Sequence, residues 1–405
     1  MTLRTPRGAA VPPFYAGEIA REAAALAMQG RDIVPMHFGE PRLAPPAVAL
    51  DAARRATATD LASTHAYWHS PALQQRIARH YRDDYGVDVA AERILLTNGA
   101  SAGLVAAFTV LFGAGDRVGI ARPGYPAYRN SLQALQRTVV EIDAGAVQRW
   151  RLTADAVAAV GGLQGLIVAS PGNPTGVVLA RDELAALAAE CRRQHAWLIS
   201  DEIYHGITYG GRAASALEVE PDVIVVNSFS KLYRMPGWRL GWLVVPERLI
   251  ERFRAHLVNL FLTPTSVSQH AALAAMDATD DVAAAVAGYA ANRKRLLEAL
   301  PTAGLPRLCV PDGAFYVYAD VADYTDDSLA FCRRLLADTG VAITPGIDFD
   351  TVHGGSHVRF SFAGSLDDVD RALARLAPWL AAQPRRAGAV RGEPAARAGT
   401  GLHAG

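Results

Sequence analysis

Residues 227–242 read NSFSKLYRMPGWRLGW, with Lys231 near their centre. They follow an apolar run, 223–226, that predicts a buried strand, so Lys231 lies just beyond a strand end. Burial lowers the pKa of a lysine, and the neutral amine can form an imine with an aldehyde. Side chains suited to holding a phosphate stand close by: Ser228, Ser230 and Arg239. An aldehyde together with a phosphate suggests pyridoxal phosphate, although a surface lysine at a strand-to-helix turn explains this stretch equally well.

From about residue 92 the sequence repeats one order of elements: an apolar strand, a polar or glycine-rich loop, and a helix. This order predicts an α/β fold with a mostly parallel sheet and helices on both of its faces. We predict strands over 94–97, 117–121, 165–169, 197–200 and 223–226, and an edge strand over 240–245. Polar clusters follow these strands. Since ligands of open α/β sheets bind at the carboxyl ends of the strands, we expect the site there.

The remaining chain predicts a second, smaller α+β domain. Helices are expected over 16–30, 47–57 and 71–85, and a long helical region over 249–300 with an interruption near Thr263–Pro264. Shorter elements are expected over 33–38, 315–319, 328–339, 341–344, 357–362 and 366–380. We divide the chain into an N-terminal arm and part of the small domain (1–45), a large cofactor-binding domain (46–285), a C-terminal small domain (286–383) and a disordered tail (384–405).

Composition excludes several classes of partner. The 405 residues contain 40 Lys+Arg and 40 Asp+Glu, so no net charge favours nucleic acid or an anionic membrane. No uncharged apolar run approaches 18 residues, and the N-terminus does not read as a secretory signal. The three cysteines form no CxxC pair, which fits a reducing cytoplasm. His353 and His357 flank two glycines and are interpreted as a surface loop, so no metal site is expected.

Seven motifs occur along the chain: FGEP (38–41), NGASAG (98–103), PGYP (123–126), PGNPTG (171–176), DEIY (201–204), SFSK (228–231) followed by RLGW (239–242), and RFSF (359–362). In this order they resemble the fold-type I aminotransferases of class I/II, which use pyridoxal 5'-phosphate. The resemblance covers about residues 33–380. It implies an aspartate-aminotransferase-like fold with a seven-stranded sheet, and a homodimer with its active site at the subunit interface.

The resemblance also implies roles for individual residues around the cofactor. Lys231 would carry the cofactor as an aldimine and then move the substrate's proton, and Asp201 would face the pyridine nitrogen and keep it protonated. Tyr204 and Asn173 would donate hydrogen bonds to the ring oxygen, and Tyr125 would stack on the ring. The phosphate would be held by Ala100, Ser101, Ser228, Ser230 and Arg239.

Other implied roles concern the substrate and the second subunit. Arg359 would bind the substrate carboxylate with help from Gly39 and Asn173, whereas the alternating pattern of residues 357–362 alone predicts an exposed arginine. Tyr67 is matched to the tyrosine that relatives give to the neighbouring subunit's phosphate. The sequence around Tyr67 lacks the glycine that relatives have there, and Arg42 stands where they commonly have aspartate.

These observations predict an aminotransferase that moves an amino group from an α-amino acid to a 2-oxo acid. A lyase or decarboxylase on the same fold is the alternative, because the cofactor-binding motifs do not separate the two. A transcriptional regulator with an aminotransferase-like domain would need an added DNA-binding region for which 1–15 and 384–405 leave no room. No lysine or arginine is evident for a second substrate carboxylate. We therefore expect a neutral or aromatic substrate side chain, with wall residues Phe14, Tyr15, Phe38 and Trp68.

Overall fold

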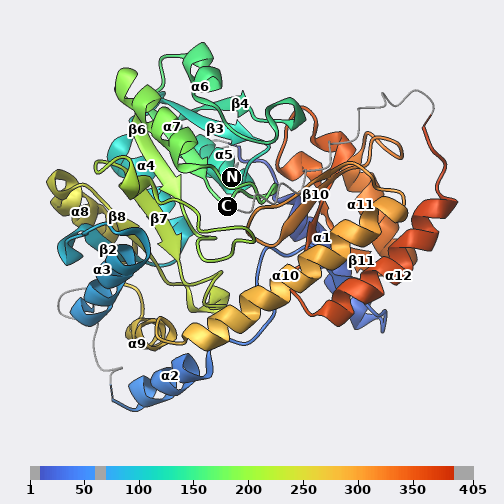
Figure 1. Ribbon diagram of the computed structural model, residues 1–405, viewed down its shortest axis with the longest axis horizontal. Helices are drawn as coiled ribbons and strands as arrows, with labels where there is room; N and C mark the ends of the chain where they lie inside the picture. Colours follow the sequence, from blue (N-terminus) through green and yellow to red (C-terminus); the bar gives the residue numbers. More distant parts are fainter. Residues whose placement is uncertain (1–9, 60–69, 387–405) are drawn as a thin grey trace, which may run out of the picture.

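The computed structural model describes residues 10–59 and 70–386. Its largest element is a seven-stranded sheet with the strand order β2-β8-β7-β6-β5-β3-β4 (Figure 1). The strands are β2 (Ile94–Thr97), β3 (Arg117–Arg122), β4 (Thr138–Asp143), β5 (Gly165–Ala169), β6 (Trp197–Asp201), β7 (Ile224–Ser228) and β8 (Gly241–Val244). All neighbouring pairs are parallel except those of β8, which is antiparallel to both β2 and β7. The predicted α/β fold is confirmed.

Helices cover both faces of this sheet. Helices α4 (Ala100–Leu111), α5 (Pro126–Ala134) and α8 (Ile250–Phe261) pack on one face, where Leu95 of β2 joins their buried cluster. On the other face lie α3 (Pro71–Tyr85), α6 (Ala154–Val160) and α7 (Arg181–Arg193). Helix α9 (Ser266–Ala275) packs against α3, and α2 (Ala47–Thr59) packs against α9. There Ile94 and Leu96 of β2 are buried. Successive residues of a strand point to opposite faces, so a strand covered on both sides is apolar throughout.

One prediction about this sheet is wrong, and one of its strands was not predicted. Residues 240–245 do not form an edge strand, because β8 lies between β2 and β7 and is buried along its whole length. The actual edge opposite β2 is β4, which sequence analysis missed. Its sequence, TVVEID, mixes polar and apolar residues because an edge strand is only partly covered.

A smaller antiparallel sheet has the order β12-β13-β10-β9, and a separate pair joins β1 to β11 in parallel. These strands are β1 (Val34–Pro35), β9 (Leu308–Cys309), β10 (Tyr316–Asp320), β11 (Val341–Ala342), β12 (Thr344–Pro345) and β13 (His357–Ser361). Helices α1 (Tyr15–Met28), α10 (Thr279–Thr302), α11 (Ser328–Thr339) and α12 (Leu366–Ala382) share their core. In Figure 1, α10 runs from beside α9 to the small sheet.

Several predicted elements differ in detail. The helical region 249–300 is broken twice, after Phe261 and again after Ala275. Residues 33–38 contain only a two-residue strand, and 341–344 are divided between β11 and β12, which belong to different sheets. The domain boundaries stay a prediction, and α10 runs across the one placed after residue 285. Most of the predicted tail and arm, residues 387–405 and 1–9, lies outside the described residues.

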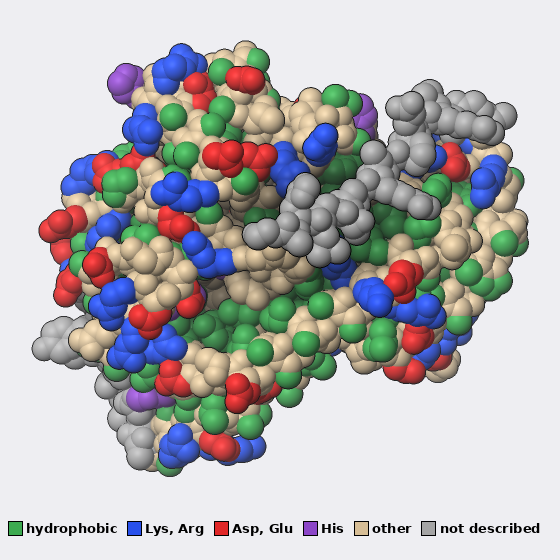
Figure 2. Space-filling view, in the orientation of Figure 1, with side chains coloured by type: hydrophobic (Ala, Val, Ile, Leu, Met, Phe, Trp, Pro, Cys, Tyr) green, Lys and Arg blue, Asp and Glu red, His purple; other side chains and the backbone are tan. Residues whose placement is uncertain are grey.

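The surface carries charges of both signs. Figure 2 shows basic and acidic side chains interspersed over the face that it presents, as expected for a chain with no net charge. Among the described residues, no helix has the length and apolar character needed to cross a membrane.

Candidate active site

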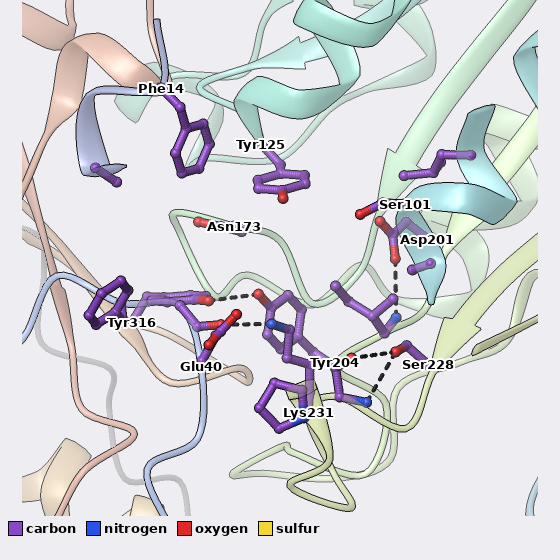
Figure 3. A pocket seen from close by; sticks show the side chains of 18 of the residues that line it. Phe14, Glu40, Ser101, Tyr125, Asn173, Asp201, Tyr204, Ser228, Lys231 and Tyr316 are labelled. Atoms are coloured by element: carbon purple, nitrogen blue, oxygen red, sulfur yellow. Dashed lines mark hydrogen bonds between the residues drawn. The ribbon is translucent and has the colours of Figure 1, made fainter. Parts of the chain in front are cut away.

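A cavity of about 590 Å³ lies between the large sheet and the small sheet. Twelve of the thirteen residues predicted for the site line it: Gly39, Ala100, Ser101, Tyr125, Asn173, Asp201, Tyr204, Ser228, Ser230, Lys231, Arg239 and Arg359. The thirteenth, Tyr67, lies outside the described residues, as does the expected wall residue Trp68. Figure 3 shows Asp201 and Ser228 at one end of the cavity, and Glu40 and Tyr316 at the other.

Lys231 follows β7 by three residues, and its side chain enters the cavity. The Nζ atom donates a hydrogen bond to the backbone oxygen of Gly39, at 2.7 Å. Burial lowers the pKa of Lys231 from 10.5 to about 8; Glu40 opposes this, while the positive charges of Arg359 and Arg239 add to it. A substantial fraction of this amine is therefore neutral near pH 8, as a nucleophile and proton carrier must be.

Asp201 is the last residue of β6 and is fully buried beside the cavity. Its Oδ2 accepts a hydrogen bond from the Tyr128 hydroxyl at 2.5 Å, and its Oδ1 accepts one from the backbone N–H of Ile203 at 3.2 Å. Burial raises the pKa of Asp201 from 3.8 to about 6, although both hydrogen bonds and the charge of Lys231 lower it. A buried carboxylate without a cation bonded to it is suited to pairing with a positively charged group of a ligand.

The start of α4 and the segment after β7 form the end of the cavity suited to an anion. Helix α4 begins at Ala100, and the positive end of its dipole faces this region. Arg239 lies against Gly99, so closely that a Cβ atom on Gly99 would be 2.6 Å from Nη2. The hydroxyls of Ser228 and Ser230 are 2.8 Å apart. Together these groups offer backbone, hydroxyl and guanidinium donors at one place.

Arg359 lies in β13 at the other end of the cavity and is only 4 % exposed. The exposed arginine predicted by the alternating pattern is therefore wrong. Its Nη1 donates to Oδ1 of Asn173 at 2.8 Å, and its Nη2 donates to the backbone oxygen of His37 at 2.8 Å and to Oγ1 of Thr344 at 3.1 Å. Within the described part of the chain, its Nε has no hydrogen-bond partner. A buried donor of this kind is suited to a carboxylate.

Aromatic side chains form the rest of the wall. Tyr125 makes edge contacts with Phe14, at 6.4 Å between ring centroids, and with Tyr128, at 5.4 Å. Of the expected wall residues, Phe14 and Phe38 line the cavity, whereas Tyr15 is not among its lining residues. The Tyr204 hydroxyl is 2.7 Å from that of Tyr316.

Four polar residues that line the cavity were not predicted from the sequence: His37, Glu40, Tyr128 and Tyr316. Glu40 is part of the FGEP motif but received no role. Tyr128 lies in the first turn of α5, three residues after Tyr125, which precedes this helix, and the two rings are in contact. Tyr316 begins β10, and no nearby motif marks it.

Comparisons with known proteins agree with this geometry. The family model "Aminotransferase class I and II" matches residues 31–376. The chain is 45 % identical to valine–pyruvate aminotransferase of Mycobacterium tuberculosis, over 95 % of this chain and 100 % of that protein. A crystal structure of an aminotransferase from Mycobacterium tuberculosis superposes with a TM-score of 0.92 at 45 % identity, covering 94 % of this chain and all of that one.

A more distant structure, a mutant of Thermus thermophilus aspartate aminotransferase, has a TM-score of 0.85 at 31 % identity, over 91 % of this chain and 97 % of that one. These proteins are all described as aminotransferases, which supports amino-group transfer over the lyase or decarboxylase alternative. The chain is an aminotransferase and belongs to the class I and II aminotransferase family.

Proposed function

We propose that this aminotransferase binds pyridoxal phosphate in the cavity around Lys231 and moves an amino group from a neutral α-amino acid to a 2-oxo acid. The observation that carries the proposal is the arrangement of three charged groups. The Lys231 amine lies in one cavity with the buried Asp201 carboxylate and the buried Arg359 guanidinium. An aldehyde, a ring nitrogen and a substrate carboxylate each have a matching group there.

The residues present fit this cofactor. Asp201 has no cation bonded to it among the described residues, so a protonated pyridine nitrogen would supply its missing partner. The donors at the start of α4, with Ser228, Ser230 and Arg239, would hold the phosphate. Tyr125 would cover one side of the ring, and Asn173 and Tyr204 would donate to the ring oxygen. When bound, pyridoxal phosphate supplies an aldehyde that accepts amino groups and a ring that withdraws electrons from the substrate's Cα.

Side chains of the protein would bind the substrate and transfer its proton. Arg359 would fix the substrate carboxylate with its fork of donors, and so hold the Cα hydrogen toward Lys231. With a pKa near 8, the Lys231 amine would take the Cα proton and return it to the cofactor side. Asp201, ionised above about pH 6, would keep the ring nitrogen protonated throughout. The wall of Phe14, Tyr125 and their neighbours would limit the access of water.

The cavity lining supports a neutral substrate side chain. Phe14, Phe38 and Leu104 are apolar lining residues, and Ser101 is uncharged. Among the described residues that line the cavity, the positive charges are those of Lys231, Arg239 and Arg359, and each already has a role. None remains for a second carboxylate. The similarity to an enzyme described as valine–pyruvate aminotransferase supports the same choice, so we propose a branched or small aliphatic amino acid as donor.

We further propose a homodimer with the active site at the subunit interface, working in the cytoplasm. Large apolar side chains are exposed on α2 and around the end of α8: Val48 (48 %), Leu260 (51 %) and Leu262 (66 %). Exposed apolar side chains of this size can be covered by another protein surface. The three cysteines are buried and unpaired, which fits a reducing compartment. Light scattering of the purified protein tests the dimer, because a monomeric mass would contradict it.

A half-reaction screen tests the main proposal. The purified protein, loaded with pyridoxal phosphate, is mixed with single amino acids without any acceptor, and the visible spectrum is followed. We expect valine and other neutral amino acids to convert the cofactor to its amino form within one turnover, and aspartate and glutamate to react much more slowly. Conversion by aspartate alone would contradict the proposed substrate class. Failure of the protein to take up the cofactor would contradict the site.

A further inference from the structure

Tyr316 links two groups that belong to different parts of the proposed site. Its hydroxyl lies 2.7 Å from the hydroxyl of Tyr204, and both side chains are buried. Tyr316 begins β10 of the small sheet, whereas Tyr204 follows β6 of the large sheet. The hydrogen bond between them therefore joins the two sheets across the cavity, as Figure 3 shows.

The ring of Tyr316 supports Arg359. The guanidinium carbon lies 4.4 Å from the centroid of the Tyr316 ring and 4.7 Å from that of Phe349. Cations over aromatic faces are attracted by the ring, and more strongly where water is excluded. The Tyr316 hydroxyl also packs against Gly39, where a Cβ atom would lie 2.5 Å from the hydroxyl oxygen. The carbonyl of Gly39 accepts the hydrogen bond from Lys231.

We propose that Tyr316 is a positioning residue: its hydroxyl donates to Tyr204 and so directs the Tyr204 proton to the cofactor's ring oxygen, while its ring holds Arg359 in place for the substrate carboxylate. The argument rests on the proposed function, in which Tyr204 donates to that oxygen. A phenol has one proton and can accept another hydrogen bond at its oxygen. Once Tyr204 gives its proton to the cofactor, the contact with Tyr316 can be satisfied only if Tyr316 is the donor.

Two hydrogen bonds in series strengthen each other, by roughly 10–30 % per bond. Donation from Tyr316 therefore makes Tyr204 a stronger donor to the ring oxygen. A donor on that oxygen stabilises the oxygen's negative form, so the oxygen binds less strongly the proton that it shares with the neighbouring imine nitrogen. The pKa of this imine is therefore lowered. We call it the spectral pKa, because protonation of the imine changes the visible absorbance. Loss of either hydroxyl should raise this spectral pKa, and loss of the Tyr204 hydroxyl should raise it more.

A double-mutant cycle read by spectroscopy tests the hydroxyl. The cofactor-loaded wild type, Tyr316→Phe, Tyr204→Phe and the double variant are titrated with pH while their visible absorbance is recorded. We expect Tyr204→Phe to raise the spectral pKa by about one to two pH units. Tyr316→Phe should raise it by a few tenths of a unit in the wild-type background. In the Tyr204→Phe background, Tyr316→Phe should leave the spectral pKa unchanged, because the Tyr316 hydroxyl acts through Tyr204.

Tyr318→Phe is the matched control. Tyr318 is in the same strand and equally buried, but its hydroxyl has no hydrogen-bond partner among the described residues. The spectral pKa of the Tyr318→Phe variant should equal that of the wild type. An unchanged spectral pKa in Tyr316→Phe, or an equal rise in both backgrounds, would overturn the inference while the wild-type titration still supports the proposed site. A wild type without a cofactor spectrum would overturn both.

The ring is tested with a second substitution. Tyr316→Phe keeps the ring under Arg359, so the KM for the amino acid should stay within about twofold of the wild type. Tyr316→Leu removes the ring and should raise KM by roughly 5- to 30-fold, the equivalent of one desolvated cation–π contact. Equal KM values in the two variants would contradict the role of the ring. Circular dichroism and a melting curve show whether each variant is folded.

Discussion

Replacing Arg359 with glutamine should abolish most of the enzyme's preference for amino acids over the corresponding amines. In the structure, Arg359 is buried, and its Nε has no hydrogen-bond partner in the described part of the chain. If the guanidinium binds the substrate carboxylate through two charge-assisted hydrogen bonds, each contributes about 1.5–3 kcal/mol. Their loss corresponds to a fall in kcat/KM of about 10²- to 10⁴-fold.

The assay compares two substrates in single-turnover half-reactions. One is an amino acid that the enzyme accepts, and the other is the amine that remains when its carboxylate is removed. Arg359→Gln should lower kcat/KM for the amino acid by the factor above and leave the slow reaction of the amine nearly unchanged. Arg359→Lys keeps the charge but loses the fork, so it should lie between the wild type and Arg359→Gln.

A structural cost must be separated from this effect. Arg359→Gln leaves Oδ1 of Asn173 without its donor and removes one of the two donors to the backbone oxygen of His37, which keeps the Thr344 hydroxyl. This loss should lower the free energy of unfolding by about 1–3 kcal/mol. Denaturant unfolding measures that loss, and the kinetics are compared well below the transition. The reasoning is refuted if the amine and the amino acid slow equally, or if neither slows in a folded variant.

Three further predictions concern Lys231, Asp201 and Gly99. In the cofactor-free protein, the rate at which an amine reagent labels Lys231 should reach half its maximum near pH 8, because the pKa of Lys231 is lowered. The exposed Lys294 serves as the internal control. A midpoint near pH 10.5 for Lys231 would contradict this prediction. Asp201 has a raised pKa of about 6, so the folded cofactor-free protein binds more protons than the unfolded chain between about pH 4 and 6. Its contribution to stability, up to roughly 3 kcal/mol, should be present below pH 4 and lost as pH rises through 6. The melting temperature of Asp201→Asn should lack this component, and identical pH profiles would speak against it. Gly99 has φ 82° and ψ 168°, a backbone conformation essentially restricted to glycine, and a Cβ there would press on Arg239. Gly99→Ala should weaken phosphate and cofactor binding by about 1–3 kcal/mol in equilibrium titrations, and unchanged affinity would exclude this part of the phosphate site.

Much of the site could be predicted because its residues follow strands of one parallel sheet. Asp201 ends β6, and Ser228 ends β7, its neighbour in the sheet. The carboxyl ends of parallel strands share an edge, so the order of motifs along the chain already places these groups together. The order of strands was not predictable in the same way. Residues 240–245 form a short apolar run, which shows that a strand is buried but not which strands lie beside it.

The residues of the small sheet were harder to predict. Tyr316 reaches the site only because β10 pairs with β13, which places Tyr318 opposite Arg359. That pairing joins segments about 40 residues apart, and periodicity does not encode it. The alternating pattern wrongly predicted an exposed Arg359, because an alternating strand is expected to have one face in contact with water. Four of the five residues of β13 are buried, and Arg359 faces the cavity rather than solvent.

The central claim is that Lys231 holds the cofactor, and the composition of the chain makes one measurement decisive. The sequence contains two lysines, Lys231 and the exposed Lys294. Borohydride reduces the double bond between a lysine and the cofactor's aldehyde to a stable amine, and mass spectrometry of the digested protein locates the added mass. We predict the phosphopyridoxyl group on the Lys231 peptide in the wild type and in Lys294→Arg, and none on either peptide in Lys231→Ala. Modification at Lys294, or none at Lys231 in the cofactor-loaded wild type, would contradict the account.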